Sequence, residues 1–296
     1  MHFLRSWRAL LVREFIEHRI PFLYFPAGIL TLFVLSAGSG LAYNRFRFAE
    51  DLHLGAPLKL FEVGYLVLIG LWLAYTGIAL FFYFGDAFAA DRRNNAMLFW
   101  KSMPVTDVKI LSAKFLAGIT LFPAIIYGMA VASGLLFILA LNIAPWTFPG
   151  FSAPNLGMTL LSFVQVTLFG IIYIAVGMLW YAPFMAWVGG LSAVFGRWSL
   201  PLAFVIPGLL MAMENMIAFQ QIPRGGYIWG YLSKRFQYGL SNFDWGLMVA
   251  APVPFDARTY TWLLFRELDW VAMGTGLAFA VVVVLLASEY RRRRIA

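Results

Sequence analysis

Six apolar stretches, each long enough to cross a lipid bilayer, restrict this chain to few possible folds. A helix needs about 20 mostly apolar residues to cross about 30 Å of hydrocarbon. The stretches that meet this length cover residues 22–42, 62–85, 114–141, 160–195, 200–219 and 270–288. Only 12% of the 296 residues are charged, and 62% are hydrophobic. We therefore predict an all-α integral membrane protein in which residues 1–296 form a single transmembrane domain of six transmembrane helices.

The fourth stretch is too long for one upright helix. It contains Pro183, and proline kinks a helix by removing a backbone donor. We interpret the stretch as one long helix, kinked or tilted, that begins as an interfacial segment near Asn155. Dividing it into two spans would give seven in total.

The basic residues decide between six spans and seven. Arginines cluster near both ends of the chain, in residues 5–19 and 291–294. An even number of spans places both clusters on the same side, and the positive-inside rule makes that side the cytoplasm. Seven spans would send one cluster outward. The sequence therefore predicts a multi-pass protein of six spans with both termini in the cytoplasm.

Two segments outside the spans are themselves amphipathic or apolar. In residues 1–20, apolar side chains recur at steps of three and four while Arg5, Arg8 and Arg13 lie largely off that stripe, which is typical of an interfacial helix. The stripe consists of Phe3, Leu4, Trp7, Leu10, Leu11, Phe15 and Ile16. We expect Trp7 and Phe15 to anchor it in the inner leaflet. Residues 220–269 are too rich in Trp, Tyr and Gly for a solvated loop, so we expect re-entrant or interfacial helices on the outer side.

The sequence lacks the motifs of an enzyme. There is no Gly-x-x-x-x-Gly-Lys-Ser/Thr loop to hold ATP phosphates, and no Gly-x-Ser-x-Gly turn for a nucleophilic serine. The chain has no cysteine, and its three histidines, His2, His18 and His53, are too scattered for a metal site. We expect no catalytic site, no metal and no cofactor in this chain. The net charge of +8 lies at the ends of apolar runs, so it indicates membrane orientation and not nucleic-acid binding.

One ionisable residue stands out inside an apolar span. Glu214 lies in the sequence LLMAMENMIAF, and a carboxylate in a membrane span is costly enough to indicate a functional site. Glu214 and the adjacent Asn215 are therefore candidates for a transport pathway. The alternative is structural, because Glu214 lies near the outer interface, where it can cap a helix, extend its carboxylate to water or pair with Arg224.

The loop of residues 86–113 carries the strongest recognition signal. A helical stretch is followed by a break at Pro104 and by a new helix that Thr106 can cap. Leu98, Phe99 and Trp100 form an apolar patch flanked by basic residues, which is typical of a protein docking site. The alternative is that these aromatics only anchor the loop at the membrane interface.

This loop resembles that of a known family. The sequence DRRNNAMLFWKSMPVTD, followed by Ser112, Ala113 and Lys114, resembles the loop of the type-2 permeases of ATP-binding-cassette (ABC) exporters. The resemblance covers the whole chain in topology and residues 86–118 closely in sequence. It implies a bacterial cytoplasmic (inner) membrane protein whose loop carries a coupling helix for a separate ATPase subunit. That subunit would bind the ATP and magnesium.

The resemblance also implies particular residues and partners. It assigns contact with the ATPase subunit to Asp91, Arg92, Arg93, Asn94, Leu98, Phe99, Trp100, Lys101, Ser102 and Pro104. A homodimer, or a pair with a sister permease, would enclose the pathway. Membrane lipid surrounds the spans.

Two functions remain open from the sequence. The first is a permease that exports a hydrophobic or amphipathic substrate (a lipid, peptide or drug) by alternating access driven by a separate ATPase. The second is a membrane enzyme or assembly scaffold acting on lipid or glycan at the outer face. Its candidate groups, Asp244, Asp256, Arg258, Glu267 and Asp269, have no spacing that indicates a reaction.

Overall fold

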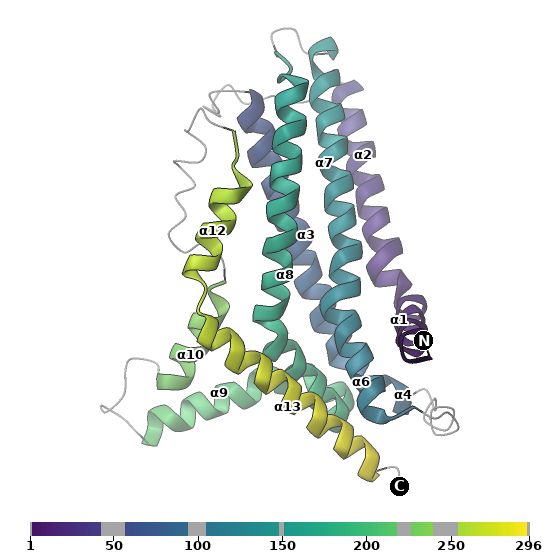
Figure 1. Ribbon diagram of the computed structural model, residues 1–296, viewed down its shortest axis with the longest axis vertical. Helices are drawn as coiled ribbons and strands as arrows, with labels where there is room; N and C mark the ends of the chain where they lie inside the picture. The colour runs from purple at the N-terminus through teal and green to yellow at the C-terminus, as the bar shows by residue number, and fades with distance from the viewer. Residues whose placement is uncertain are drawn as a thin grey trace.

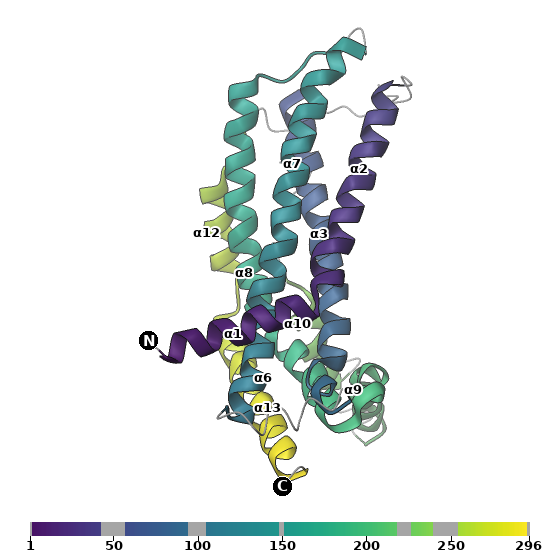
Figure 2. The same cartoon turned by 90° about the vertical axis from the view of Figure 1, so that its right-hand side faces the viewer.

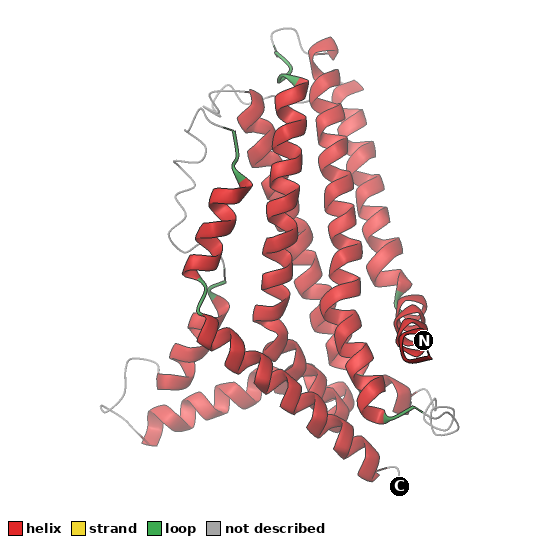
Figure 3. Cartoon of the chain, in the orientation of Figure 1, coloured by secondary structure: helices red, strands yellow, loops and turns green. Residues whose placement is uncertain are grey.

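The fold is helical throughout the part of the chain that the structure describes. The structure is a computed structural model that describes residues 2–42, 57–93, 105–147, 151–217, 226–238 and 254–294. All regular elements in these ranges are helices (Figure 3). Five helical stretches are long and apolar enough to cross a membrane: Ile20–Gly40, Pro57–Ala87, Asp107–Thr147, Leu156–Ile217 and Trp270–Arg293. The prediction of an all-α protein with several helices suited to cross a membrane is confirmed for the described residues.

A bundle of long helices forms the body of the molecule. Helices α2 (Phe25–Ala42), α3 (Pro57–Ala87), α7 (Phe122–Thr147) and α8 (Leu156–Phe195) run side by side along its longest axis (Figures 1 and 2). Aromatic side chains fill the core between them, and small residues let the helices approach. Gly134 of α7, for example, lies so close to the Tyr65 ring of α3 that a Cβ there would collide with it.

Helix α8 matches the long fourth stretch of the sequence. It is one helix of 40 residues with Pro183 inside, and the Asn155 side chain accepts a hydrogen bond of 3.2 Å from the Met158 amide at its start. At 1.5 Å per residue it is about 60 Å long, twice the thickness of a bilayer core. The expectation of a single long helix that starts near Asn155 is confirmed, and its interfacial start stays a prediction.

Helix α9 (Ser199–Ile217) follows α8 after a single short turn, Gly196–Trp198. It runs across the base of the bundle at a wide angle to α7 and α8 (Figures 1 and 2). The two helices form one apolar stretch of 62 residues, Leu156–Ile217, which explains why five candidate stretches replace the six expected spans. A sixth span at residues 200–219 stays a prediction.

The predicted outer segment contains two short helices in its described part. These are α10 (Gly226–Phe236) and α12 (Ala257–Glu267), and α12 lies beside α8 (Figure 1). Helix α13 (Trp270–Arg294) starts three residues after α12 and crosses obliquely to the base, where the chain ends. Short helices in this segment agree with the expectation, while their position relative to a membrane stays a prediction.

Helix α1 (His2–Glu17) lies across the bundle near its base, end-on in Figure 1 and side-on in Figure 2. It joins α2 through a short π-helical segment, Ile20–Tyr24, which contains Pro21. The apolar stripe that we expected to face lipid is used partly for protein contact. Leu10 is buried against Ile110 and Ala113 of α6 (Asp107–Leu116), and Trp7 packs on the same cluster.

Candidate functional site

Four buried charged side chains meet at the base of the bundle. They come from four helices: Glu14 from α1, Asp91 from α4 (Ala90–Arg93), Lys114 from α6 and Arg291 from α13. Their exposed fractions are 3%, 1%, 0% and 5%. We call this set the basal ionic cluster.

Asp91 lies at the centre of the cluster. Its Oδ2 accepts a hydrogen bond of 2.8 Å from Nη1 of Arg291, and its Oδ1 lies 3.5 Å from Nζ of Lys114. Arg13 approaches the same Oδ1 at 4.0 Å from a partly exposed position. Arg291 is shared, since its Nε lies 2.8 Å from Oδ1 of Asp107, the first residue of α6. One arginine of the last helix therefore contacts both α4 and α6.

Glu14 provides the second buried carboxylate. Its Oε1 lies 3.1 Å from Nζ of Lys114, and its Oε2 accepts a hydrogen bond of 3.2 Å from the Tyr83 hydroxyl. The same hydroxyl lies 3.0 Å from the Lys114 carbonyl oxygen. His18, just after the end of α1, places Nδ1 3.8 Å from Glu14 Oε2. Glu14 thus joins α1 to α3 and α6.

The buried charges of the cluster balance. Two carboxylates face two cations, so no net charge is carried into the interior by these four side chains. Removing a charge from water costs several kcal/mol per ion, and only close opposite charges offset this penalty. Loss of one member would leave its partner buried and unpaired. The cluster therefore favours one arrangement of α1, α4, α6 and α13 over all others.

The cluster holds both ends of the loop that carries the recognition signal. On the entry side, α3 ends at Ala87, the Ala89 amide bonds to the Asp86 carbonyl oxygen at 3.0 Å, and α4 begins at Ala90. On the exit side, the Thr106 hydroxyl accepts a hydrogen bond of 3.4 Å from the Lys109 amide, as predicted, and α6 begins at Asp107.

Only part of the predicted coupling set lies in this region. Asp91 is described, and it faces the protein interior rather than a free surface. Arg92 and Arg93 complete α4, but their side chains are not described. The other predicted positions, Asn94, Leu98, Phe99, Trp100, Lys101, Ser102 and Pro104, lie outside the described residues. The aromatic docking patch therefore stays a prediction.

Glu214 caps a neighbouring helix. Its Oε1 accepts a hydrogen bond of 2.7 Å from the Tyr227 amide, and its Oε2 accepts one of 3.0 Å from the Ile228 amide. These amides open α10, so the carboxylate occupies a helix N-terminus, where negative charge is favoured. Asn215 donates to the Met211 carbonyl oxygen at 2.7 Å. This geometry supports the structural alternative for Glu214; the pathway role of Glu214 and Asn215 stays a prediction.

A second buried pair, at the opposite end of the bundle, was not anticipated. Glu62 is completely buried and accepts hydrogen bonds from Lys59 Nζ at 2.7 Å, Ser162 Oγ at 2.6 Å and the Phe255 amide at 2.8 Å. It fixes the start of α12 against α3 and α8. From the sequence, Glu214 was the ionisable residue singled out within a span. The available signal was the three-residue spacing of Lys59 and Glu62 on one helix.

Arg235 of α10 was also missed, although only 1% of its surface is exposed. It inserts between α8 and α13, donating to the carbonyl oxygens of Trp180, at 2.9 Å, and Ala272. Its guanidinium carbon lies 4.7 Å from the centre of the Trp180 ring, a cation–π contact. Backbone oxygens and an aromatic face thus surround this cation.

Acidic residues of the outer segment have structural partners. Asp256 caps α12 through the Arg258 amide at 3.1 Å and the Thr259 hydroxyl, and these hydrogen bonds lower the pKa of Asp256. Asp269 caps α13 through the Ala272 amide at 2.9 Å and pairs with Lys234 at 2.5 Å. The amide and the ammonium lower the pKa of Asp269. Among the described residues, no group of three or more His, Asp or Glu side chains is placed to hold a metal ion.

No family model, no curated protein and no solved structure matches this chain.

Proposed function

We propose that this chain is the permease subunit of a type-2 ABC exporter, working with a separate ATPase subunit. The resemblance of residues 86–118 to the loop of that family supports the proposal. The observation that carries it furthest is the burial of Asp91. This residue begins the resembling sequence, and ion pairs tie it to α6 and α13.

A loop that transmits force needs a stiff base. If an ATPase subunit moves residues 94–104, the movement reaches α4 on one side and α6 on the other. Arg291 contacts Asp91 of α4 and Asp107 of α6, so both ends of the loop and the last helix would move together. Packed interfaces of this kind shift between discrete arrangements rather than deform gradually. The basal ionic cluster would thus convert loop movement into movement of whole helices.

The proposal includes the setting of the chain. It lies in the bacterial cytoplasmic membrane with both termini in the cytoplasm and assembles as a homodimer or with a sister permease. ATP and magnesium are bound by the ATPase subunit. The substrate class is hydrophobic or amphipathic, such as a lipid, peptide or drug, which agrees with the apolar spans.

The alternative of an outer-face enzyme receives less support. Of its candidate groups, Asp256 and Asp269 serve as helix caps, and Asp244 lies outside the described residues. A carboxylate that is occupied by backbone amides is poorly placed to act on a substrate.

Coupling is tested with aromatic substitutions in the loop. The tagged protein is purified from its native membrane, and co-purified ATPase subunit and ATP hydrolysis are measured for Phe99→Ala and Trp100→Ala. If these side chains fill a cleft on the partner, each substitution weakens the complex by about 2 kcal/mol or more, roughly 30-fold in affinity. Trp146→Ala, at an exposed position on the far end of α7, is the control and leaves the complex intact. If no ATPase subunit co-purifies with the unsubstituted protein, the proposal is overturned.

Orientation is tested by labelling. Because the chain has no cysteine, single cysteines can be placed at Arg47, Ser102, Ser241 and Ala296 and exposed to a membrane-impermeant reagent in intact cells. Arg47→Cys and Ser241→Cys are expected to react, and Ser102→Cys and Ala296→Cys only after the cells are opened. The reverse pattern would contradict cytoplasmic termini.

A further inference from the structure

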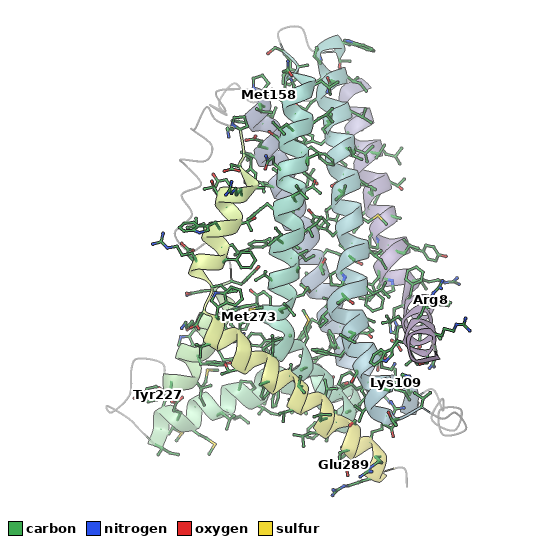
Figure 4. All side chains as sticks on the ribbon, in the orientation of Figure 1. Arg8, Lys109, Met158, Tyr227, Met273 and Glu289 are labelled. Atoms are coloured by element: carbon green, nitrogen blue, oxygen red, sulfur yellow. The ribbon has the colours of Figure 1, made fainter. Side chains whose placement is uncertain are left out.

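One face of α1 points away from the protein and carries arginines. Arg5, Arg8, Val12 and Ile16 follow one another at steps of three and four, so they share one side of α1, and Arg19 continues the series just after α1 ends at Glu17. Arg5, Arg8 and Arg19 are exposed, as are Val12 and Ile16. Figure 4 shows Arg8 on the side of α1 away from the bundle. We call these five residues the outward face.

The opposite face of α1 is occupied by the protein. Trp7 and Leu10 pack on α6, Glu14 belongs to the basal ionic cluster, and Ser6 accepts a hydrogen bond of 2.5 Å from Lys109 Nζ. These contacts fix the rotation of α1 about its own axis. The outward face therefore cannot turn toward the bundle without breaking the buried ion pairs.

The position of α1 places this face at a membrane surface. The candidate span Ile20–Gly40 begins three residues after α1 ends at Glu17. Since α1 lies across the bundle while α2 runs along it, α1 can only lie along the surface of the membrane that α2 enters (Figure 2). Its outward face then meets the headgroups and the outermost part of the acyl chains.

The charge of this face is not neutralised within the described chain. Arg5 and Arg8 have no ion-pair partner among the described residues, and Arg19 contacts the Tyr24 ring with its guanidinium carbon 5.7 Å from the ring centre. The nearby carboxylate of Glu17 is directed to Arg13, at 4.0 Å. Three exposed guanidinium groups thus flank Val12 and Ile16 along about four helical turns. Guanidinium groups bind phosphate oxygens in a bidentate manner.

We propose that the outward face of α1 binds the phosphate headgroups of anionic phospholipids, with Val12 and Ile16 inserted among the upper acyl carbons. This interaction is independent of any ATPase partner. Each basic residue near an anionic surface strengthens binding by about fivefold, so three arginines favour anionic over zwitterionic lipid by roughly 100-fold in local binding constant.

A fluorophore next to this face measures the lipid composition around it. The absence of cysteine allows a single label at Ala9→Cys, which is exposed between Arg8 and Val12. The labelled full chain is reconstituted in vesicles that contain equal amounts of phosphatidylglycerol and phosphatidylcholine. In one preparation the anionic lipid carries bromine as a quencher, and in the other the zwitterionic lipid does. Leu35→Cys, exposed on α2, is the control site.

The expected result is stronger quenching by brominated phosphatidylglycerol at Ala9→Cys and equal quenching by both lipids at Leu35→Cys. Arg5→Gln, Arg8→Gln and Arg19→Gln together abolish the preference, whereas the same three changed to Lys retain most of it. One molar salt also reduces it, because the Debye length falls to about 3 Å. Arg292→Gln with Arg293→Gln, which removes exposed arginines paired with Glu289, leaves the preference unchanged.

Two outcomes overturn the proposal. Equal quenching by the two lipids at Ala9→Cys would show that the outward face does not select anionic headgroups. Stronger displacement by inorganic phosphate than by sodium chloride at equal ionic strength would make the face a site for a soluble phosphate instead. The triple Gln variant should unfold at the same temperature as the unsubstituted protein, which shows that its loss of lipid preference does not come from misfolding.

Discussion

Asp91 and Arg291 are 200 positions apart in the chain and share a hydrogen bond of 2.8 Å in the protein interior. Asp91 lies at the entry to the loop of residues 94–104, and Arg291 lies near the end of the last helix. Their contact joins α4, which precedes that loop, to the C-terminal helix α13. The pair therefore holds α13 directly against α4.

Removing the carboxylate of Asp91 is expected to destabilise the fold strongly. Asp91→Ala leaves Arg291 and Lys114 buried without this acidic partner, and breaking a buried pair in this way costs about 3–5 kcal/mol. The loss of stability is measured by unfolding the purified protein in detergent with heat or with a chemical denaturant. Asp91→Asn keeps the shape but not the charge, and it should be nearly as harmful.

The matched control for Asp91 is Glu289. Glu289 pairs with Arg292 and Arg293 in solvent on the same helix as Arg291. Because exposed pairs contribute about 0–1 kcal/mol, Glu289→Gln should change the stability little. Equal effects of the two substitutions would show that the basal ionic cluster does not hold the helices together.

Two glycines on α13 provide a sharp test of the position of Arg235. A Cβ at Gly276 would collide with the Arg235 guanidinium, whereas a Cβ at Gly274 meets nothing within 4 Å. Gly276→Ala should therefore destabilise the protein by about 1–3 kcal/mol. Gly274→Ala should be neutral or stabilise it by up to about 1 kcal/mol, because alanine favours a helix. Similar unfolding temperatures for both variants would contradict the insertion of Arg235 at this point.

The starts of two helices could be predicted from the sequence because they depend on local chemistry. Thr106 and Asn155 are capping residues, and both helices begin directly after them. Long apolar runs likewise locate the helices that are able to span a membrane. The wide angle of α9 could not be predicted, since its sequence is as apolar as that of an upright span and its direction depends on packing against α3, α8 and α10.

The candidate site could be predicted only in part. The loop sequence identified Asp91, but the partners of Asp91 were interpreted as topological charges because they lie at helix ends. Lys114 and Arg291 fit the positive-inside pattern whether or not they are buried. Pairing across 200 positions leaves no local periodicity, so it emerges only when the helices are assembled.

The start of α13 should loosen in acid. The Ala272 amide and the Lys234 ammonium hold the pKa of Asp269 below its usual 3.8. Because the folded-state pKa is lowered, the carboxylate contributes stability that is fully present above about pH 4 to 5 and is lost as the pH falls through the folded-state pKa. Hydrogen–deuterium exchange of the first amides of α13, corrected for intrinsic rates, should rise below that range. In Asp269→Asn this dependence should be absent, and a persistent rise would assign it to another group.

Glu214 offers the clearest choice between a structural and a transport role. Glu214→Ala removes the acceptor for the Tyr227 and Ile228 amides, and loss of a cap costs about 0.5–2 kcal/mol. Glu214→Gln keeps one acceptor oxygen and should retain part of this stability. Faster exchange of the Tyr227 and Ile228 amides in Glu214→Ala would show that the cap is lost.

A second variant tests the same contact from the other side. Gly226 has φ of +87°, and a Cβ there would lie 2.6 Å from Glu214 Oε2, so Gly226→Ala should release the cap. Gly230→Ala, in the same helix with nothing within 4 Å, is the matched control and should be harmless or stabilising. If both Glu214→Ala and Gly226→Ala lose stability and amide protection together, the carboxylate acts as a cap. If Glu214→Gln keeps full stability while transport is lost, Glu214 belongs to the substrate pathway.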